Sequence, residues 1–352
     1  MQAGRKTEDD GSSMKIAGRL AVAVVLSVIV VGLFLQMGRK PEKHLYKETR
    51  SSLYTLVTIT VVGDSPEKAR KATSAAYDEL DRLGRLLNFY AEDSELSAIN
   101  RNAGIKPVHV SRDTLEIIKT AVMVGEQTDG GFDVTVGPIV KLWDFKKKIL
   151  PSAAAITEKL SAVGYENIVV DEVAATVFLK KSGIQMDLGG IIKGFAADKA
   201  VQSLKANGIE DGIVAVAGDI KLFGRQPDGR PWNIGIQNPR AEGDKDELFA
   251  TVNLGTQGIS TSGDYQRYFI LDGVRYHHLL NPKTGYPESL CRSVTVIAPE
   301  AALTDAYATG IFIMGPQKGL AVLERLGMDG VIIDRDGKVL MTKGIKDKVH
   351  LL

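Results

Sequence analysis

An eighteen-residue run without a charged side chain, Leu20–Met37, constrains this chain more than any other feature of its sequence. The run reads LAVAVVLSVIVVGLFLQM, and a helix needs about 17 to 25 apolar residues to span the hydrocarbon core of a membrane. We therefore expect a transmembrane anchor over residues 14–37, after a disordered tail at 1–13. A polar linker is expected at 38–50, and a folded domain over 51–352.

The position of this run indicates on which side of the membrane the domain lies. A lone hydrophobic segment at the extreme N-terminus normally acts as an export signal. No Ala-x-Ala cleavage site follows the run, and no cysteine near its end could carry a lipid, so we expect an uncleaved, single-pass anchor. The domain is then expected on the extracytoplasmic side, which for a bacterial inner membrane is the periplasm.

Charge and cysteine content exclude several classes of protein. The 44 basic and 43 acidic residues leave a net charge of +1, so no overall basic field attracts nucleic acid, and we expect no such partner. The single cysteine, Cys291, excludes an intramolecular disulfide and a multi-cysteine zinc site. The 36 glycines exceed the usual share of about 7% and indicate tight turns or places where the backbone approaches a ligand.

Periodic patterns after residue 50 predict a mixture of helices and strands. Ser65-Pro66 predicts the start of a helix that continues to Leu87, and Asp272-Gly273 predicts the turn of a hairpin. Further helices are expected at 112–127, 153–163, 191–207, 301–313 and 316–327, and strands at 53–62, 167–170, 175–180, 213–217, 250–254, 293–298 and 330–334. Because helices and strands do not alternate regularly, the pattern favours an α+β fold with two lobes over a doubly wound sheet.

Two glycine-rich stretches are candidates for ligand binding. In Gly130–Pro138 (GGFDVTVGP), Asp133 is either a ligand contact or the acceptor that stabilises an ordinary turn. In Met186–Asp198 (MDLGGIIKGFAAD), an apolar strand meets a glycine pair and then the start of a helix. The unpaired N–H groups and positive dipole end of such a helix suit phosphate. Lys193, one turn further along, is either a phosphate contact or a solvated side chain.

A third stretch places two adjacent histidines at the end of a predicted strand. Ile259–Tyr265 (ISTSGDY) is followed, across the predicted hairpin, by His277–Pro287 (HHLLNPKTGYP). Adjacent strand residues point to opposite faces, so only one of His277 and His278 can enter a given cleft. That histidine is a candidate proton acceptor, since histidine titrates near neutral pH, and a purely structural role is the alternative.

The fourth stretch, Thr304–Gly310 (TDAYATG), carries two oxygen-bearing side chains on one face of a predicted helix. Asp305 and Thr309 are four residues apart and so lie one above the other. Together with backbone carbonyls and a phosphate group they would form the oxygen-rich sphere that Mg²⁺ prefers. In the alternative interpretation, the Thr309 hydroxyl bonds to the Asp305 carbonyl and the carboxylate is a solvated charge.

In their order and residues, these stretches resemble the ApbE family of FAD:protein FMN transferases. GGFDVTVGP, MDLGGIIKG, TSGDY, HHLLNPKTG and TDAYATG carry the resemblance, which covers about residues 51–345. It implies a two-lobed, T-fold-related mixed α/β catalytic domain with FAD in the cleft between the lobes. It also implies a Mg²⁺-dependent enzyme that cuts FAD, joins the FMN half through phosphate to a threonine or serine of a partner flavoprotein, and releases AMP. Such acceptors carry an FMN-binding domain, as in subunits of ion-translocating redox complexes.

Carried over residue by residue, the resemblance implies the site residues. Contacts to FAD are implied at Tyr90, Gly131, Phe132, Asp133, Asp187, Lys193 and Ser262. Magnesium is implied at the Asp305 carboxylate, the Thr309 hydroxyl and the Gly190 carbonyl, with His278 as the catalytic histidine. Two other functions stay open: an FAD pyrophosphatase that yields FMN and AMP, and a non-catalytic extracytoplasmic flavin-binding protein.

Overall fold

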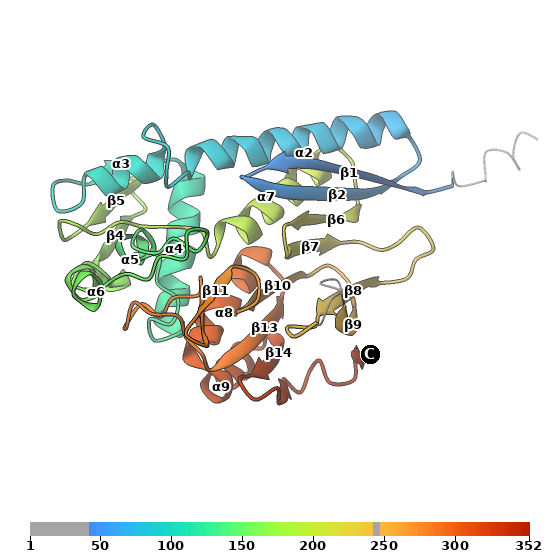
Figure 1. The fold of residues 1–352 in the computed structure, drawn as a ribbon. Coiled ribbons are helices and arrows are strands. Elements are labelled where there is room, and N and C mark those ends of the chain that lie inside the picture. The colour runs from blue at the N-terminus through green and yellow to red at the C-terminus, as the bar shows by residue number, and fades with distance from the viewer. Residues whose placement is uncertain (1–41, 242–246) are drawn as a thin grey trace, which may run out of the picture. The chain divides into compact units, whose positions relative to one another are not determined.

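The computed structural model describes residues 42–241 and 247–352, so the anchor expected at 14–37 lies outside the described residues. No helix within the described residues is both long and apolar enough to cross a membrane. The compact unit His44–Leu352 has a mixed α/β fold (Figure 1). In its described part, the strands form an eight-stranded sheet, two three-stranded sheets and a separate hairpin.

The eight-stranded sheet is antiparallel throughout, in the order β1-β2-β6-β7-β10-β13-β14-β15. Burial alternates along β6, as expected of a strand with one face toward the core. The central β13 is almost wholly buried, because both of its faces are covered. The strands are β1 (His44–Ser52), β2 (Thr55–Gly63), β6 (Asp211–Val216), β7 (Asp219–Phe223), β10 (Gly258–Gly263), β13 (Cys291–Ala298), β14 (Asp329–Asp334) and β15 (Val339–Met341).

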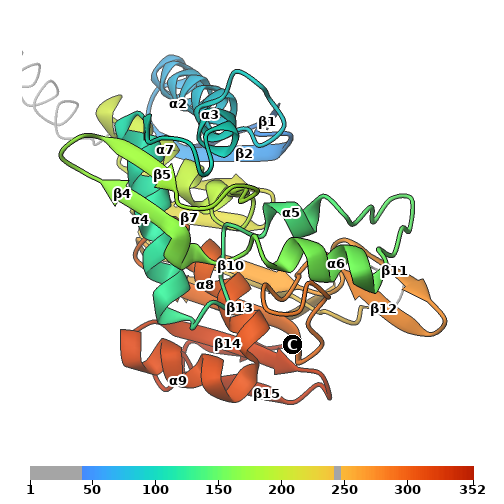
Figure 2. The same ribbon diagram turned by 90° about the vertical axis from the view of Figure 1, so that its left-hand side faces the viewer.

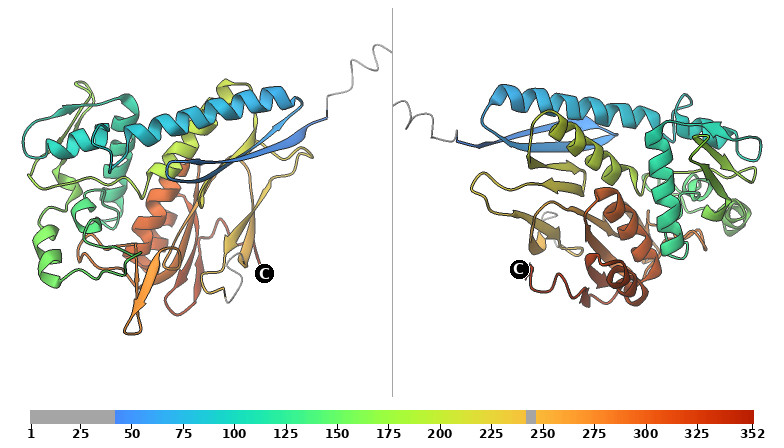
Figure 3. Two further views of the ribbon diagram at one scale, coloured as in Figure 1. Left: turned by 45° about the horizontal axis from the view of Figure 1, so that its top comes forward. Right: turned by 180° about the vertical axis from the view of Figure 1, so that it is seen from behind.

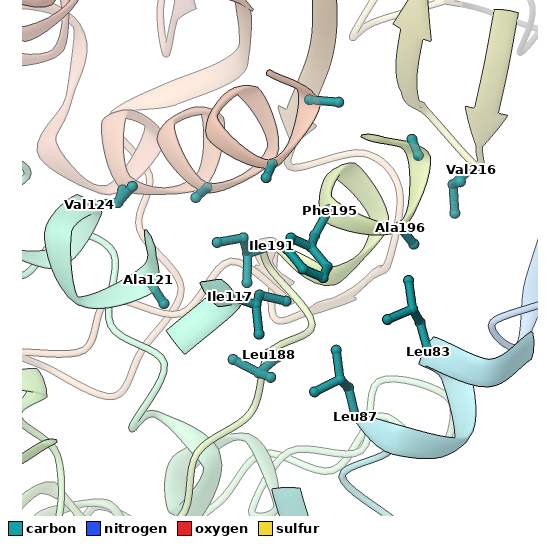
Figure 4. Close-up of a cluster of buried hydrophobic side chains, with 14 of the residues drawn as sticks. Leu83, Leu87, Ile117, Ala121, Val124, Leu188, Ile191, Phe195, Ala196 and Val216 are labelled. Carbon is teal, nitrogen blue, oxygen red and sulfur yellow. The ribbon is translucent and has the colours of Figure 1, made fainter. Parts of the chain in front are cut away.

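Helices cover one face of this sheet (Figure 3). They are α2 (Pro66–Leu86) on β1 and β2, α7 (Ile192–Ala206) on β6 and β7, α8 (Ala301–Met314) on β10 and β13, and α9 (Pro316–Leu326) on β14. The long helix α4 (Arg112–Gln127) packs against α8. Figure 4 shows Leu83 of α2, Ile117 of α4 and Phe195 of α7 in the buried cluster that joins these helices.

The other face of the sheet carries the small sheet β16-β9-β8. Trp232 and Val252 from this small sheet form a second core with Leu222 and Ile259 of the large one. The small sheet consists of β8 (Trp232–Gln237), β9 (Leu248–Leu254) and β16 (Val349–Leu351). A third sheet of β3 (Val108–His109), β5 (Thr176–Leu179) and β4 (Ile168–Asp171) packs against α4 and α3 (Glu95–Arg101). Helices α5 (Gly137–Val140) and α6 (Ala153–Leu160) lie to one side of this sheet (Figure 2).

Helices α7 and α8 approach so closely that only glycine fits between them at one position. A Cβ atom on Gly194 would lie 2.0 Å from the carbonyl oxygen of Ala301, which is far inside van der Waals contact. Each helix also binds the free N–H groups at the start of the other. Asp198 of α7 accepts hydrogen bonds from the N–H groups of Ala301 and Ala302, and Asp305 of α8 accepts one from Gly194. The backbone of one helix therefore fixes the carboxylates of the other.

Most elements predicted from the sequence are present within a few residues of their predicted bounds, and the serine cap of α2 is confirmed by the bond from the Lys68 N–H to Ser65 Oγ. The linker predicted at 38–50 is wrong at its C-terminal end, because residues 44–50 pair with β2 as part of β1. This strand lies at the sheet edge and is mostly exposed, so it lacks the apolar alternation by which strands are recognised. The next strand begins at Thr55 rather than at 53, because Leu53 and Tyr54 have φ values of 51° and 60° and form the tight turn between the two strands.

Candidate active site

A cluster of three charges, two buried carboxylates and a partly exposed ammonium, lies where α7, α8 and β7 meet. Lys193 of α7 forms an ion pair with Asp219 at the start of β7, and its Nζ lies 3.9 Å from Oδ1 of Asp305. Asp219 and Asp305 are each 3% exposed. Lys193 is therefore neither solvated nor free, contrary to the alternative interpretation of its stretch. Two carboxylates and one ammonium leave this cluster with one net negative charge.

Burial dominates the electrostatics of the cluster. It opposes the charge of Lys193, but the two carboxylates outweigh it and raise the pKa of this lysine. Burial, followed by the charge of Asp219, raises the pKa of Asp305 well above its usual range, and Lys193 and the N–H of Gly194 offset this only in part. A further cation would therefore be favoured beside Asp305.

The hydroxyl groups expected around a metal converge on the same face of α8. Thr309 Oγ1 lies 3.1 Å from Oγ of Ser262 on β10. A Cβ atom built on Gly190 would lie 3.7 Å from Thr309 Oγ1. Gly190, Thr309 and Ser262 are thus neighbours. Asp305 lies one turn before Thr309 on α8. The alternative interpretation of this stretch is wrong for Asp305, because its carboxylate is buried rather than solvated.

These groups fit a magnesium ion by the chemistry of their donors. Asp305 uses Oδ2 for the Gly194 N–H, which leaves Oδ1 facing Lys193. Hydroxyl, carboxylate and carbonyl oxygens are the ligands that Mg²⁺ takes, usually together with substrate phosphates and water. Among residues 42–241 and 247–352, no three His, Cys, Asp or Glu side chains group as a metal site. A cation here would accordingly depend on few charged ligands.

The glycine-rich stretch Gly130–Pro138 packs directly beside these groups. A Cβ atom on Gly190 would lie 3.0 Å from the ring of Phe132, and one on Gly131 would lie 2.7 Å from the Gly310 carbonyl oxygen. The carboxylate of Asp133 is committed to the protein: Oδ1 accepts from the N–H and hydroxyl of Thr135, and Oδ2 accepts from the Tyr165 N–H. This is the arrangement expected for a stabilised turn.

The two adjacent histidines have different surroundings. Both ring nitrogens of His277 are used, since Nε2 lies 2.7 Å from the Glu288 carbonyl oxygen and Nδ1 accepts from the Leu279 N–H. In His278, by contrast, Nδ1 is buried and finds no hydrogen-bond partner among the residues that the structure describes. Burial, followed by the positive charge of Arg267, lowers the pKa of His278 to about 3. His278 is therefore neutral near pH 7 with one nitrogen free.

Arg267 is a site residue that the sequence interpretation missed. The hairpin β11 (Tyr268–Leu271) and β12 (Val274–His277) pairs Tyr268 with His277, and the His278 N–H then donates to the Arg267 carbonyl. Residues that face each other across antiparallel strands project from the same face, so the Arg267 and His278 side chains are neighbours. The positive charge of Arg267 also reaches Lys193 and Tyr90, where it offsets a small part of the rise in their pKa values. Arg267 is exposed, and within residues 42–241 and 247–352 its guanidinium forms no ion pair with a carboxylate.

Tyr90 and Asp187 lie at the rim of the same region. Tyr90 is 78% exposed, and its pKa is raised by burial of its hydroxyl and then by the charge of Asp187. Asp187 accepts a hydrogen bond from the Gly189 N–H, and burial raises the pKa of its carboxyl group. The free ring of Tyr90 and the carboxylate of Asp187 therefore border the loop that leads to Gly190.

A cavity of about 390 Å³ lies elsewhere, between α4, α7 and the start of α8. None of the site residues predicted from the sequence lines it. Two of its lysines are paired, Lys199 with Glu116 and Lys221 with Asp198. The cavity is therefore separate from the candidate active site, and these lysine charges are already paired within it.

Comparisons with known proteins agree with this arrangement. Residues 53–332 match the model of the ApbE family. The FAD:protein FMN transferase of Salmonella typhimurium is 34% identical over 295 residues, which cover 82% of this chain and 84% of that protein. The enzyme of the same name from Treponema pallidum is 33% identical over 346 residues, covering 93% and 95%.

Solved structures give the same result. The ApbE protein of Thermotoga maritima superposes with a TM-score of 0.79 and 34% identity, covering 87% of this chain and 99% of that one. The flavin transferase ApbE of Vibrio cholerae superposes with a TM-score of 0.77 and 29% identity, with the same coverage. The chain therefore belongs to the ApbE family.

Proposed function

We propose that this protein transfers the FMN part of FAD to a threonine or serine hydroxyl of a partner flavoprotein. The hydroxyl oxygen bonds to the phosphorus on the FMN side of the pyrophosphate, the bond from that phosphorus to the bridging oxygen breaks, and AMP leaves with that oxygen. The observation that carries the proposal is the convergence of a neutral histidine, an exposed guanidinium and an oxygen-rich cluster of net negative charge. The names of the relatives support the same activity.

His278 is the proposed proton acceptor. A general base must lie within hydrogen-bond reach of the hydroxyl, and Nδ1 of His278, which has no partner among the described residues, would offer a lone pair in the tautomer protonated at Nε2. A pKa of about 3 makes the imidazole a weak base in the free protein. The negative charge of a bound pyrophosphate counteracts Arg267 and Lys193 and so raises this pKa. Substrate binding would thus make His278 a better base where one is needed.

Magnesium, when bound, would neutralise charge on the phosphoryl oxygens as they react. Asp305 would hold it through Oδ1, with the Thr309 hydroxyl and the Gly190 carbonyl as further ligands. Lys193 keeps Asp305 and Asp219 in place through its ion pairs. Arg267 supplies a second positive group next to His278 and would contact the phosphates directly.

The remaining contacts to FAD are assigned by position. Tyr90 is exposed and free to stack on a planar ring, and Asp187 borders the same rim. Gly131, Phe132 and Ser262 would line the part of the site nearest to Thr309. Asp133 would hold the loop in shape, because its carboxylate oxygens are already used. We place FAD in a cleft between two lobes, and the domain on the periplasmic side of the inner membrane behind the Leu20–Met37 anchor.

The test is an acceptor assay. The protein is incubated with FAD, MgCl₂ and a candidate FMN-binding domain, and the acceptor is inspected for flavin fluorescence in a denaturing gel. An acceptor whose target hydroxyl residue is replaced by alanine is the matched control. Fluorescence on the intact acceptor alone is expected. Release of FMN and AMP without any labelled protein would instead establish an FAD pyrophosphatase, and FAD binding without turnover would establish a flavin-binding protein.

A further inference from the structure

A hairpin with exposed apolar side chains lies next to the proposed site. Strands β11 and β12 project from the rest of the unit (Figure 2), and their turn is Asp272-Gly273. Ile270, Val274 and Leu271 are 57%, 50% and 41% exposed, and we call these three residues the hairpin tip. Leu271 and Val274 are paired on one face of the hairpin and Ile270 lies on the other, so both faces of the tip are apolar. Exposed apolar side chains on a projecting element are typical of a surface that binds another protein.

The base of the hairpin is held rigidly, although its tip is exposed. Phe269 is 3% exposed and stacks on Tyr276 with ring centroids 5.3 Å apart. Tyr276 contacts Trp143, whose indole N–H donates to the Gly285 carbonyl. An isolated two-stranded hairpin is only marginally stable, so this aromatic cluster is what keeps it in place. A partner would therefore meet a surface that is already ordered, which lowers the entropic cost of binding.

A basic segment adjoins the hairpin. The ring of Phe145 lies 6.1 Å from that of Phe269, and residues 146–150 (KKKIL) follow it with all five side chains exposed. We call Lys146–Leu150 the basic loop. The neighbouring Asp144 forms an ion pair with Lys147 at 3.4 Å, so its carboxylate offsets the charge of one of the three lysines. The two segments together form an apolar centre with a positive rim.

We infer that the hairpin tip and the basic loop form the docking surface for the acceptor flavoprotein, a partner with an apolar patch bordered by acidic residues. The inference rests on the proposed function. Strand β12 leads directly into His278, and the four residues from Val274 to His278 span roughly 13 Å at about 3.3 Å per residue. An interface of about 800 Å² on each partner extends over a larger distance than this. A protein seated on the hairpin tip would therefore also cover His278, where its hydroxyl has to arrive.

The chemistry of the surface favours this occupant. The nucleophile belongs to a second protein, so part of that protein must be held beside the site during every turnover. The hairpin tip is continuous with the site along one strand, and its positive rim would attract and orient an acidic partner. A second copy of this chain, or an anionic membrane, would require no such connection to His278.

The experiment compares the double variant Ile270→Ser/Val274→Ser with the wild type at saturating FAD and magnesium, over a range of acceptor concentrations. We expect the KM for the acceptor to rise at least tenfold while FAD binding, followed by flavin fluorescence quenching, is unchanged. Ile105→Ser/Val173→Ser is the matched control, because these residues are 71% and 101% exposed but lie outside both segments. It should leave the KM for the acceptor unchanged.

A charge-reversal variant, Lys146→Glu/Lys148→Glu, tests the positive rim independently. Its kcat/KM for the acceptor should fall at least tenfold at low ionic strength, and the difference from wild type should shrink as salt is added. If the wild type labels the acceptor but both variants keep its KM within twofold, the docking inference is wrong and the proposed function stands. If the variants only lose binding to vesicles containing anionic lipid, the surface belongs to the membrane. If the wild type itself labels no acceptor, the proposed function fails, and the inference with it.

Discussion

Replacing Asp305 by asparagine separates its role in catalysis from its role in the fold. Asparagine keeps the shape and still offers an oxygen to the Gly194 N–H, but it removes the charge next to Lys193. The cluster with Asp219 then changes from one net negative charge to none. Two unit charges 4 Å apart interact by about 4 kcal/mol at an effective dielectric constant of about 20, so affinity for a cation should fall about 10²- to 10³-fold.

Stability should respond in the opposite way. Burial and Asp219 both disfavour the charge on Asp305, and they raise its pKa. Removing that charge should therefore leave the thermal midpoint of the magnesium-free protein unchanged or raise it. Asp198 is the matched control, since it also holds N–H groups at a helix start, those of Ala301 and Ala302. Asp198→Asn should destabilise the fold by about 1–3 kcal/mol, because one N–H group loses its acceptor and Lys221 loses its ion-pair partner, without changing the magnesium dependence of transfer.

Two measurements distinguish a role of Asp305 in metal binding from a role in stability. The initial rate of acceptor labelling is followed as a function of magnesium concentration for wild type, Asp305→Asn and Asp198→Asn. Differential scanning calorimetry in EDTA gives the thermal midpoints of the same three proteins. Wild-type rates and an unchanged magnesium requirement in a folded Asp305→Asn protein would refute the metal assignment. A loss of activity that follows a loss of stability would show that the carboxylate is structural.

Four further predictions concern other parts of the chain. Arg267→Gln should weaken FAD binding about 10- to 100-fold, as expected for a lost charge-assisted hydrogen bond. Calorimetric titration should find the affinity for riboflavin, which has no phosphate, unchanged, and equal losses of affinity for both ligands would contradict a phosphate contact. The Cε1–H NMR resonance of His278, assigned with His278→Gln, should not shift between pH 5 and 8 in the free protein, because a lowered pKa of about 3 keeps the ring neutral there. Binding of FAD without magnesium should raise the midpoint of this titration, and a midpoint near 6.5 in the free protein would exclude a buried neutral base. Gly194→Ala should separate α7 from α8 and lower stability by about 1–3 kcal/mol or more, measured by urea unfolding, whereas an unchanged midpoint would mean that the two helices are not in close contact. Protease added to intact spheroplasts should digest the domain that follows Leu20–Met37, and full protection would disprove the periplasmic orientation.

The sequence itself contains enough information to place Arg267 beside His278. A two-residue turn at Asp272-Gly273 pairs Leu271 with Val274, and counting back along both strands places Arg267 opposite His278. The register of the hairpin therefore identifies Arg267 as the neighbour of His278, because a tight turn fixes the pairing of every residue that follows it. Arg267 and His278 lie one position beyond the paired strand residues, so a prediction that stops at the strand ends does not include them.

The partner of Lys193 could not be found in this way. Asp219 begins β7, which is 26 residues away along the chain, and its position depends on the order of strands in the large sheet. No local pattern distinguishes it from the other acidic residues of loops and turns. Edge strand β1 was missed for a related reason, since its register with β2 is regular but its side chains are mostly polar and exposed. Local periodicity indicates which side chains are buried. The positions of Asp219 and of strand β1 depend instead on how strands pair within the large sheet.

The mutual capping of α7 and α8 explains how a lone carboxylate can be ready to bind a cation. Asp305 is held by the Gly194 N–H through Oδ2, so its rotamer is fixed before any ligand arrives, while Oδ1 lies 3.9 Å from Nζ of Lys193. Asp198 fixes the start of α8 in the same manner, so the helix that carries Asp305 and Thr309 cannot move freely relative to α7. A site held within about 0.5 Å by the surrounding fold loses little entropy on binding. The same hydrogen bonds that stabilise the helix pair therefore also prepare the proposed magnesium site.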